Sequence, residues 1–146
     1  MKQKGFTLIE LLAVIVILAI IALIATPMIL GVINTAKKGS AESAALGYID
    51  AVEKSAVIAL LDDEATGSST IAADTYTTSS NGKTLTATDG TTLTVTFKGD
   101  APEDGSTVTV GSDGVITSAK LGFKGIYAYW VNYDGNKATV GTDKIS

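Results

Sequence analysis

The residue whose type and position most clearly suggest chemistry is Glu10, a glutamate near the start of a long apolar run. The run begins at Phe6 and continues with few interruptions to Ile33, and it contains no basic residue. An ionisable side chain in such a segment usually serves a function, because an unpaired charge is costly to place in hydrocarbon. A positive partner for Glu10 therefore has to come from outside the run.

A second explanation of Glu10 needs no charge at all. Thr7-x-x-Glu10 has the spacing of a capping box, in which the glutamate accepts a hydrogen bond from the backbone at the start of a helix. The two explanations are compatible, and both require a helix that begins close to Thr7.

Composition excludes most other chemistry. The 146 residues include no cysteine and no histidine, which removes thiol nucleophiles, disulfides, imidazole catalysis and the usual zinc ligands. The formal charge is −4, and every basic residue is a lysine, so bidentate arginine contacts are excluded. We therefore expect no enzymatic activity, no cofactor, no metal and no specific nucleic-acid partner.

The apolar run, residues 6–33, is long enough to cross a membrane, which takes about 20 helical residues. A cleaved secretory signal is the rival interpretation, but Glu10 interrupts its apolar start and no small-residue cleavage pattern follows. Lysines lie on both sides of the run, so charge bias leaves the orientation of the span open.

The helical pattern continues beyond the span. Over residues 34–61 apolar residues recur at steps of three and four, which predicts an amphipathic helix. The acidic residues Asp62, Asp63 and Glu64 oppose the helix dipole, so we expect the helix to end near Leu61. The predicted buried stripe comprises Ala41, Ala44, Ala45, Tyr48, Ile49, Val52, Ala56, Ala59 and Leu60.

The rest of the chain indicates a loop over residues 62–82 and a β-region over 83–146. Apolar residues there alternate with threonine and other polar residues, as in strands with one buried face. Turn pairs separate these segments: Asn81-Gly82, Asp89-Gly90, Asp113-Gly114 and Asp134-Gly135. The predicted fold class is α+β, with one long N-terminal helix packed by its second half on an antiparallel meander sheet.

The stretch from Lys4 to Ile15, K-G-F-T-L-I-E-L-L-A-V-I, resembles the leader and helix start of type IV pilins and related pseudopilins. The shared features are a short basic leader, Gly5 followed by Phe6, and Glu10 five residues into the mature chain. The close resemblance is confined to the N-terminal segment, and the remainder matches only as an architecture. The resemblance divides the chain into a leader (1–5), a transmembrane and assembly helix (6–33) and a head (34–146).

The resemblance implies that prepilin peptidase cuts between Gly5 and Phe6 and methylates the new amine on Phe6. It implies a single-pass protein of the cytoplasmic membrane that an assembly ATPase and platform machinery stack into a helical surface fibre of identical subunits. In that fibre Glu10 would neutralise the Phe6 amine of a neighbour. Expected functions of the fibre are adhesion, motility and biofilm formation.

Pro27 lies where many type IV pilins carry a helix-kinking proline. Proline removes a backbone donor and crowds the carbonyl four residues earlier, here that of Leu23, so a bend is expected. Membrane helices also tolerate proline without any functional need for it.

Two further features have plainer explanations. Asp62–Glu64 and Asp100–Asp104 could offer oxygen ligands to calcium, but neither completes a loop motif, and solvated turn chemistry is favoured. The strand Ile126–Tyr133 carries three tyrosines and Trp130, which could bind a glycan or bases. A core strand with its aromatic side chains against the helix is the favoured interpretation.

Three functions remain in competition. The leading one is the structural subunit of a type IV pilus. A pseudopilin of a type II secretion or DNA-uptake machine shares the same N-terminal features. A membrane-anchored binding domain that never polymerises is the third, and it predicts no cleavage between Gly5 and Phe6.

Overall fold

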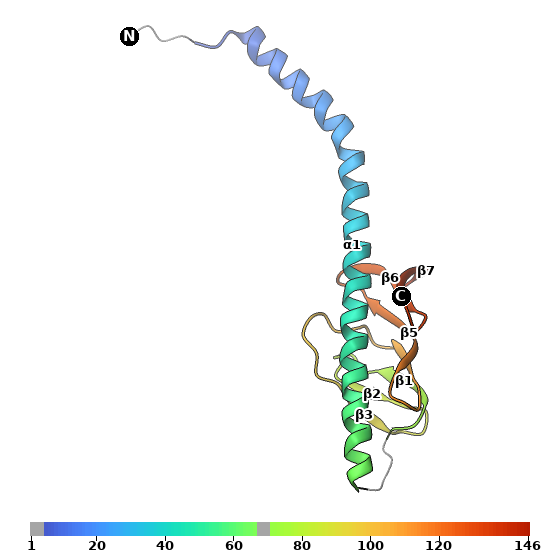
Figure 1. Cartoon of the computed structure of the whole chain (residues 1–146). Coiled ribbons are helices and arrows are strands. Elements are labelled where there is room, and N and C mark those ends of the chain that lie inside the picture. The colour runs from blue at the N-terminus through green and yellow to red at the C-terminus, as the bar shows by residue number, and fades with distance from the viewer. Residues whose placement is uncertain (1–4, 67–70) are drawn as a thin grey trace. The chain divides into compact units, whose positions relative to one another are not determined.

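The structure is a computed structural model that describes residues 5–66 and 71–146, with the backbone alone described for 63–66. The described residues form one helix, α1 (Leu8–Thr66), and seven strands (Figure 1). The chain divides into two compact units, Met1–Ala36 and Lys37–Ser146, which are described separately below. The leader residues Lys2 and Lys4 lie outside the described residues.

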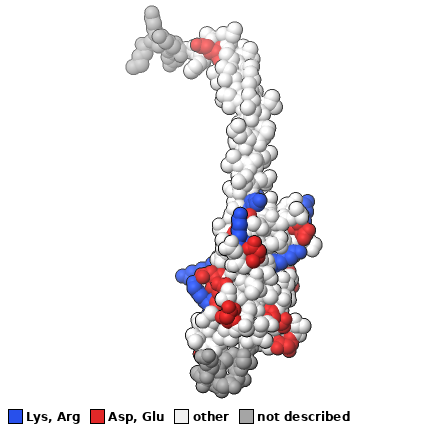
Figure 2. Space-filling model, turned by 45° about the vertical axis from the view of Figure 1, so that its right-hand side comes forward, with Lys and Arg blue, Asp and Glu red and all other residues white. Residues whose placement is uncertain are grey.

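In the first unit, α1 carries an apolar surface on all sides. Every large apolar side chain from Phe6 to Ile33 is exposed, from 89% for Phe6 to 44% for Ile33. By length and composition, with a mean hydropathy of 3.2, this part of α1 could cross a membrane, although a signal sequence passes the same test. Figure 2 shows almost no charged atoms along it.

In the second unit, α1 buries one stripe against the sheet. The fully buried residues follow steps of three, four and seven along the helix, as an amphipathic helix requires. Ala44, Ala59 and Leu60 are partly buried at the margins of the same core. The predicted stripe is therefore confirmed. Its fully buried members are Ala41, Ala45, Tyr48, Ile49, Val52 and Ala56.

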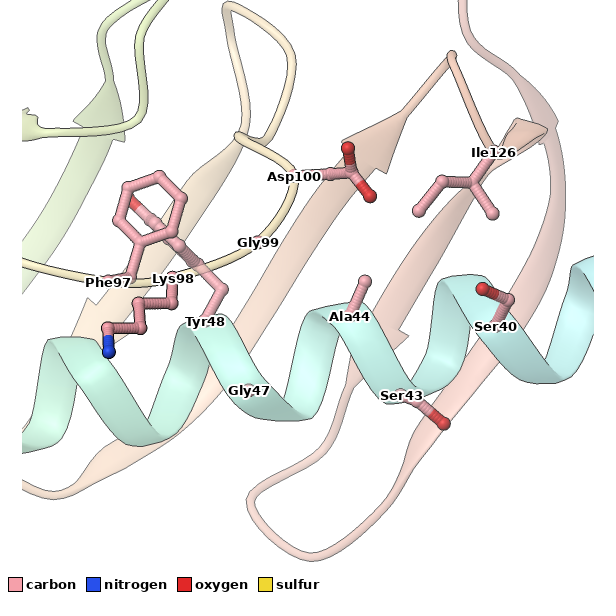
Figure 3. A pocket seen from close by; sticks show the side chains of 10 residues that line it. All are labelled: Ser40, Ser43, Ala44, Gly47, Tyr48, Phe97, Lys98, Gly99, Asp100 and Ile126. Atoms are coloured by element: carbon pink, nitrogen blue, oxygen red, sulfur yellow. The ribbon is translucent and has the colours of Figure 1, made fainter.

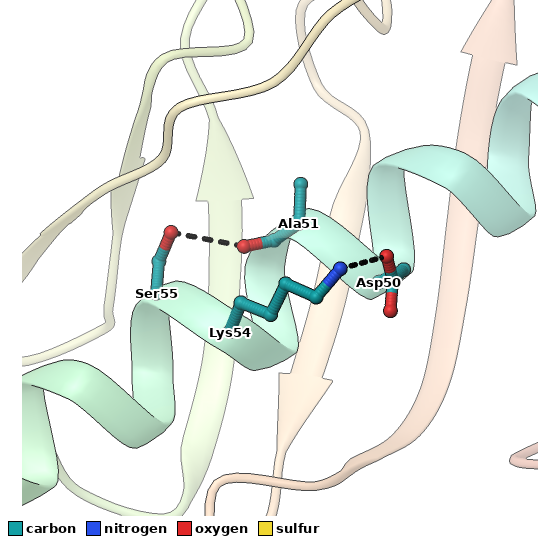
Figure 4. Close-up of polar contacts among 4 residues, drawn as sticks. All are labelled: Asp50, Ala51, Lys54 and Ser55. Carbon is teal, nitrogen blue, oxygen red and sulfur yellow. Dashed lines mark hydrogen bonds and ion pairs between the residues drawn. The ribbon is translucent and has the colours of Figure 1, made fainter.

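The exposed side of this part of the helix carries both polar and apolar side chains. Lys54 Nζ lies 2.6 Å from Asp50 Oδ2, one helical turn away (Figure 4), and an exposed pair of this kind contributes only a few tenths of a kcal/mol. The partly buried Ser55 donates through Oγ to the Ala51 carbonyl at 2.9 Å, at the margin of the core. The exposed apolar side chains of this part are Leu46, Val57, Ile58 and Leu61.

The helix ends later than the sequence predicts. It continues through Asp62 to Thr66, beyond the expected end near Leu61. Unfavourable charge at a helix C-terminus costs only about 0.3–1 kcal/mol at an exposed site, which does not by itself stop a helix. The side chains of Asp63 and Glu64 lie outside the described residues.

All seven strands belong to one antiparallel sheet, in the order β3-β2-β1-β4-β5-β6-β7. The predicted α+β class, with a helix on an antiparallel sheet, is confirmed. Each of the four predicted turn pairs lies between consecutive strands, and each of their glycines has a positive φ. The strands are β1 (Asp74–Thr78), β2 (Thr84–Thr86), β3 (Thr92–Thr94), β4 (Thr107–Val110), β5 (Ile116–Phe123), β6 (Tyr127–Tyr133) and β7 (Ala138–Lys144).

The sheet differs from a simple meander. β1 pairs with both β2 and β4, so the chain returns from the β3 edge to the middle of the sheet. β1 also lies inside the predicted 62–82 loop. Its sequence, Asp-Thr-Tyr-Thr-Thr, has Tyr76 as its single apolar residue, so the alternation of buried and exposed positions is hidden by threonines. The buried positions are Tyr76 and Thr78.

Three polar side chains of α1 bind the sheet backbone. Glu42 accepts a hydrogen bond from the Val140 amide at 3.1 Å, and Glu53 accepts one from the Ile116 amide at 3.0 Å. Both glutamates flank the buried stripe, where a long side chain can reach a backbone amide of a strand.

The third contact is buried. The Tyr48 hydroxyl donates to the Gly82 carbonyl at 2.7 Å, and its burial raises the pKa of Tyr48 above the ordinary value. Gly82 has φ +65°, and a Cβ at this position would lie 2.6 Å from Pro102 Cδ. Glycine is thus the residue that lets the turn approach both Tyr48 and Pro102.

Tyr48→Phe should lower the free energy of unfolding by about 1–3 kcal/mol, because the buried Gly82 carbonyl loses its donor. Chemical denaturation of the second unit measures this change. Tyr133→Phe is the matched control: Tyr133 is only partly buried, and the described residues show no hydrogen bond from its hydroxyl. Equal losses in both variants would show that the Tyr48 contact contributes nothing.

A shortened chain, residues 36–146, should be a soluble, folded monomer, because its core lies within the second unit. Only five large apolar side chains are exposed among the described residues of that unit: Leu46, Val57, Ile58, Leu61 and Val115. Size-exclusion chromatography and a dispersed NMR spectrum would confirm this. Persistent aggregation of the shortened chain would contradict the assigned packing of the helix on the sheet.

Candidate functional site

The N-terminal segment presents the predicted processing bond before the helix starts. Gly5 and Phe6 precede α1, which begins at Leu8, and both residues are exposed. No atom outside the neighbouring residues lies within 4 Å of a Cβ built on Gly5. The peptide bond between them is therefore open to a protease, although the cleavage itself stays a prediction.

Glu10 forms the capping box that its spacing predicts. Its Oε2 accepts hydrogen bonds from the Thr7 amide at 3.0 Å and from the Thr7 hydroxyl at 2.7 Å. In return, the Glu10 amide donates to Thr7 Oγ1 at 3.4 Å. Thr7 is thus the N-cap of α1, and two amides that lack helical partners are satisfied.

The cap uses one oxygen of the carboxylate. The hydrogen bonds between Thr7 and Glu10 that involve the carboxylate both end on Oε2, and Glu10 is exposed. A positive group could therefore approach Oε1 without breaking the cap. The pairing of Glu10 with the Phe6 amine of a neighbour stays a prediction, because that contact joins two copies of the chain.

Pro27 lies within α1, and the helix continues on both sides of it. Because proline has no amide hydrogen, the Leu23 carbonyl lacks its helical donor. The preceding residue, Thr26, donates through its hydroxyl to the Ala22 carbonyl at 2.7 Å, an interaction that often accompanies a slight bend. The functional kink at Pro27 stays a prediction.

The acidic loop between β3 and β4 has a structural explanation. The Glu103 amide donates to the Gly122 carbonyl at 2.7 Å, and the Glu103 carbonyl accepts from the Thr78 hydroxyl at 3.2 Å. These bonds hold residues Asp100–Asp104 against the sheet through the backbone. Over the described residues, no three acidic side chains gather as a metal site would require.

The aromatic strand β6 is less buried than predicted. Its one fully buried residue is Val131, while Tyr127 and Tyr133 pack partly against the core. Trp130 is partly buried, and the Nζ of Lys120 lies 5.3 Å from the centre of its ring. The aromatic residues that are fully buried in the core come from other elements: Tyr48 of α1, Tyr76 of β1 and Phe123 of β5.

Comparison with protein families finds one match: residues 1–26 match the prokaryotic N-terminal methylation motif. Comparison with curated proteins and with solved structures finds no match. The match includes Gly5, Phe6 and Glu10, and it implies processing by a prepilin peptidase and handling by pilus or secretion machinery. The helix packed on a seven-stranded antiparallel sheet matches the α+β architecture of type IV pilins. The chain thus carries a class III signal peptide and is consistent with a type IV pilin-like prepilin.

Proposed function

We propose that the chain is a structural subunit of a type IV pilus, which polymerises through its N-terminal helix into surface fibres. The observation that carries this proposal is the apolar surface of α1 between Phe6 and Ile33, which the chain leaves exposed on all sides. A bilayer can cover such a surface before assembly, and the same helices of other copies can cover it afterwards. A subunit that moves from one environment to the other needs this property.

Processing would prepare the helix for assembly. Cleavage between Gly5 and Phe6 removes Lys2 and Lys4 and leaves a cationic amine next to the N-cap residue Thr7. Prepilin peptidase would methylate this amine, and an assembly ATPase with its platform would then draw the subunit out of the membrane. The product is a homo-oligomeric fibre at the cell surface.

Glu10 would guide this assembly through its charge. The cap holds the carboxylate at the first turn of α1, with Oε2 bound to Thr7. The Phe6 amine of an incoming neighbour could approach Oε1 and neutralise the carboxylate in the low-dielectric interior of the fibre. An unpaired charge there is strongly unfavourable, so pairing would favour one axial register between subunits.

Processed chains should begin at methylated Phe6. Mass spectrometry of protein sheared from cell surfaces measures the N-terminus directly. Intact Met1 on surface protein, or cleavage near Ala25, would contradict the proposal. Recovery of processed chains only from the cell envelope, with no fibres seen by electron microscopy, would instead favour a pseudopilin.

Glu10→Gln should reduce the yield of sheared fibres sharply, while membrane insertion and cleavage after Gly5 continue. Glutamine can preserve the cap through its amide oxygen, but it cannot neutralise the Phe6 amine. Thr7→Ala is the matched control, because it removes the hydroxyl of the cap and keeps the charge. The measurement compares fibre yield with the amount of processed subunit left in the membrane. Normal fibres from Glu10→Gln together with their loss in Thr7→Ala would favour the cap as the essential interaction.

A further inference from the structure

Four lysines belong to the end of the second unit at which α1 enters it. Lys37 and Lys38 are the first residues of the unit, Lys124 lies in the turn between β5 and β6, and Lys144 ends β7. All four side chains are exposed. Figure 2 shows lysine atoms around this end of the unit, although the chain as a whole is acidic.

Contacts within the unit bring these separate elements together. Ile126, two residues after Lys124, and Ser40, two residues after Lys38, line the same shallow cavity of ≈310 Å³ (Figure 3). Lys144 pairs with Tyr129 across the two last strands, and the Ile145 amide donates to the Ala128 carbonyl at 2.9 Å. The part of α1 at the start of the second unit, the β5–β6 turn and the end of β7 therefore form one surface.

Two tyrosines accompany the lysines on this surface. The rings of Tyr127 and Tyr129 are partly buried, and their centres lie 5.4 Å apart. The Nζ of Lys144 lies 5.8 Å from the centre of the Tyr129 ring. Tyrosine and lysine side chains together are typical of the membrane–water interface, where a ring can sit at headgroup level and an ammonium can contact phosphate.

Acidic side chains also lie in this part of the unit, and one ion pair is described there. Asp143 lies 3.4 Å from Lys120, and the Glu42 carboxylate accepts the Val140 amide. Asp100 lines the cavity with Ile126, and Lys124 Nζ donates to the Ser146 carbonyl at 3.2 Å. Lys37, Lys38 and Lys144 have no carboxylate partner among the described ion pairs.

We propose that this surface, formed by Lys37, Lys38, Lys124, Lys144, Tyr127 and Tyr129, binds the anionic phospholipid headgroups of the membrane that holds the span. Only three residues separate Ile33, the last apolar residue of the run, from Lys37. At about 1.5 Å per helical residue, Lys37 lies about 6 Å along the axis from the end of the run, within a Debye length of about 10 Å at 0.1 M salt. The head therefore docks on the bilayer through this end before assembly.

This inference goes beyond the proposed fibre function and depends only on membrane anchoring. Docking would hold a stored subunit in one orientation, and extraction would have to break the headgroup contacts. A bilayer is favoured over a second copy as the occupant because Lys37 and Lys38 follow the apolar run within five residues of Ile33 in the chain.

The absence of cysteine allows a clean test with the full-length chain in lipid vesicles. A single fluorescent label is placed at Gly125→Cys in the β5–β6 turn, where a Cβ meets nothing within 4 Å. The control label is placed at Asn136→Cys in the turn at the other end of β6. Quenching by a headgroup nitroxide is compared between phosphatidylcholine vesicles and vesicles that also contain phosphatidylglycerol.

We expect phosphatidylglycerol to increase quenching at position 125 but not at position 136, and high salt to abolish the increase. Replacing Lys37, Lys38 and Lys144 by glutamine should abolish it too, because each lysine near an anionic surface strengthens binding about fivefold. The matched control replaces Lys54, Lys83 and Lys137, with the same change in charge, and should keep most of the increase. Equal losses of quenching in both variants would overturn the proposal. So would quenching that depends on the number of protein chains per vesicle and not on the phosphatidylglycerol content. The second result would assign the surface to another copy of the chain.

Discussion

An apolar helix surface that the described residues leave uncovered is the constraint on which the rest of the structure depends. From Phe6 to Ile33 the large side chains of α1 are all exposed, so this part of the helix needs a bilayer or other protein around it. The second unit cannot rely on that surrounding for its own stability. It accordingly has a complete core of its own, built from the Ala41–Ala56 stripe and the sheet.

A single helix thus serves two different environments, and its sequence changes near the boundary between the two units. Before Ala36 the apolar residues surround the axis, which suits lipid, whereas after Lys37 they form one stripe, which suits a sheet. Polar side chains beside that stripe hold the helix on the sheet. Glu42 and Glu53 bind strand amides, and Tyr48 binds the turn at Gly82. The small alanines of the stripe allow close packing, while these longer side chains fix where along the sheet the helix lies.

Much of this fold was predictable from local patterns, and the exceptions have physical reasons. The stripe and the four glycine turns follow from spacing alone, and so does the Thr7–Glu10 cap. β1 has no clear alternation in its sequence because threonine occupies both of its faces. α1 extends past Leu61 because unfavourable charge at its end costs too little to stop a helix. The proposed headgroup surface leaves no local signal, since its lysines come from three segments that only the folded second unit brings together. The assembly contact of Glu10 needs a second chain, so no single sequence displays it.

Under the proposed assembly, the two explanations of Glu10 describe successive uses of one carboxylate. Before cleavage Phe6 has an ordinary peptide nitrogen, and Glu10 binds Thr7 through Oε2, at the end of the helix where negative charge is favourable. Cleavage would add positive amines to the population of subunits without disturbing any bond of the cap. The capped carboxylate would then have a fixed position and a free oxygen, as charge pairing between neighbours requires. In this view Thr7 positions the charge, Phe6 supplies its partner, and the apolar helix provides the low-dielectric surroundings in which the pair becomes decisive.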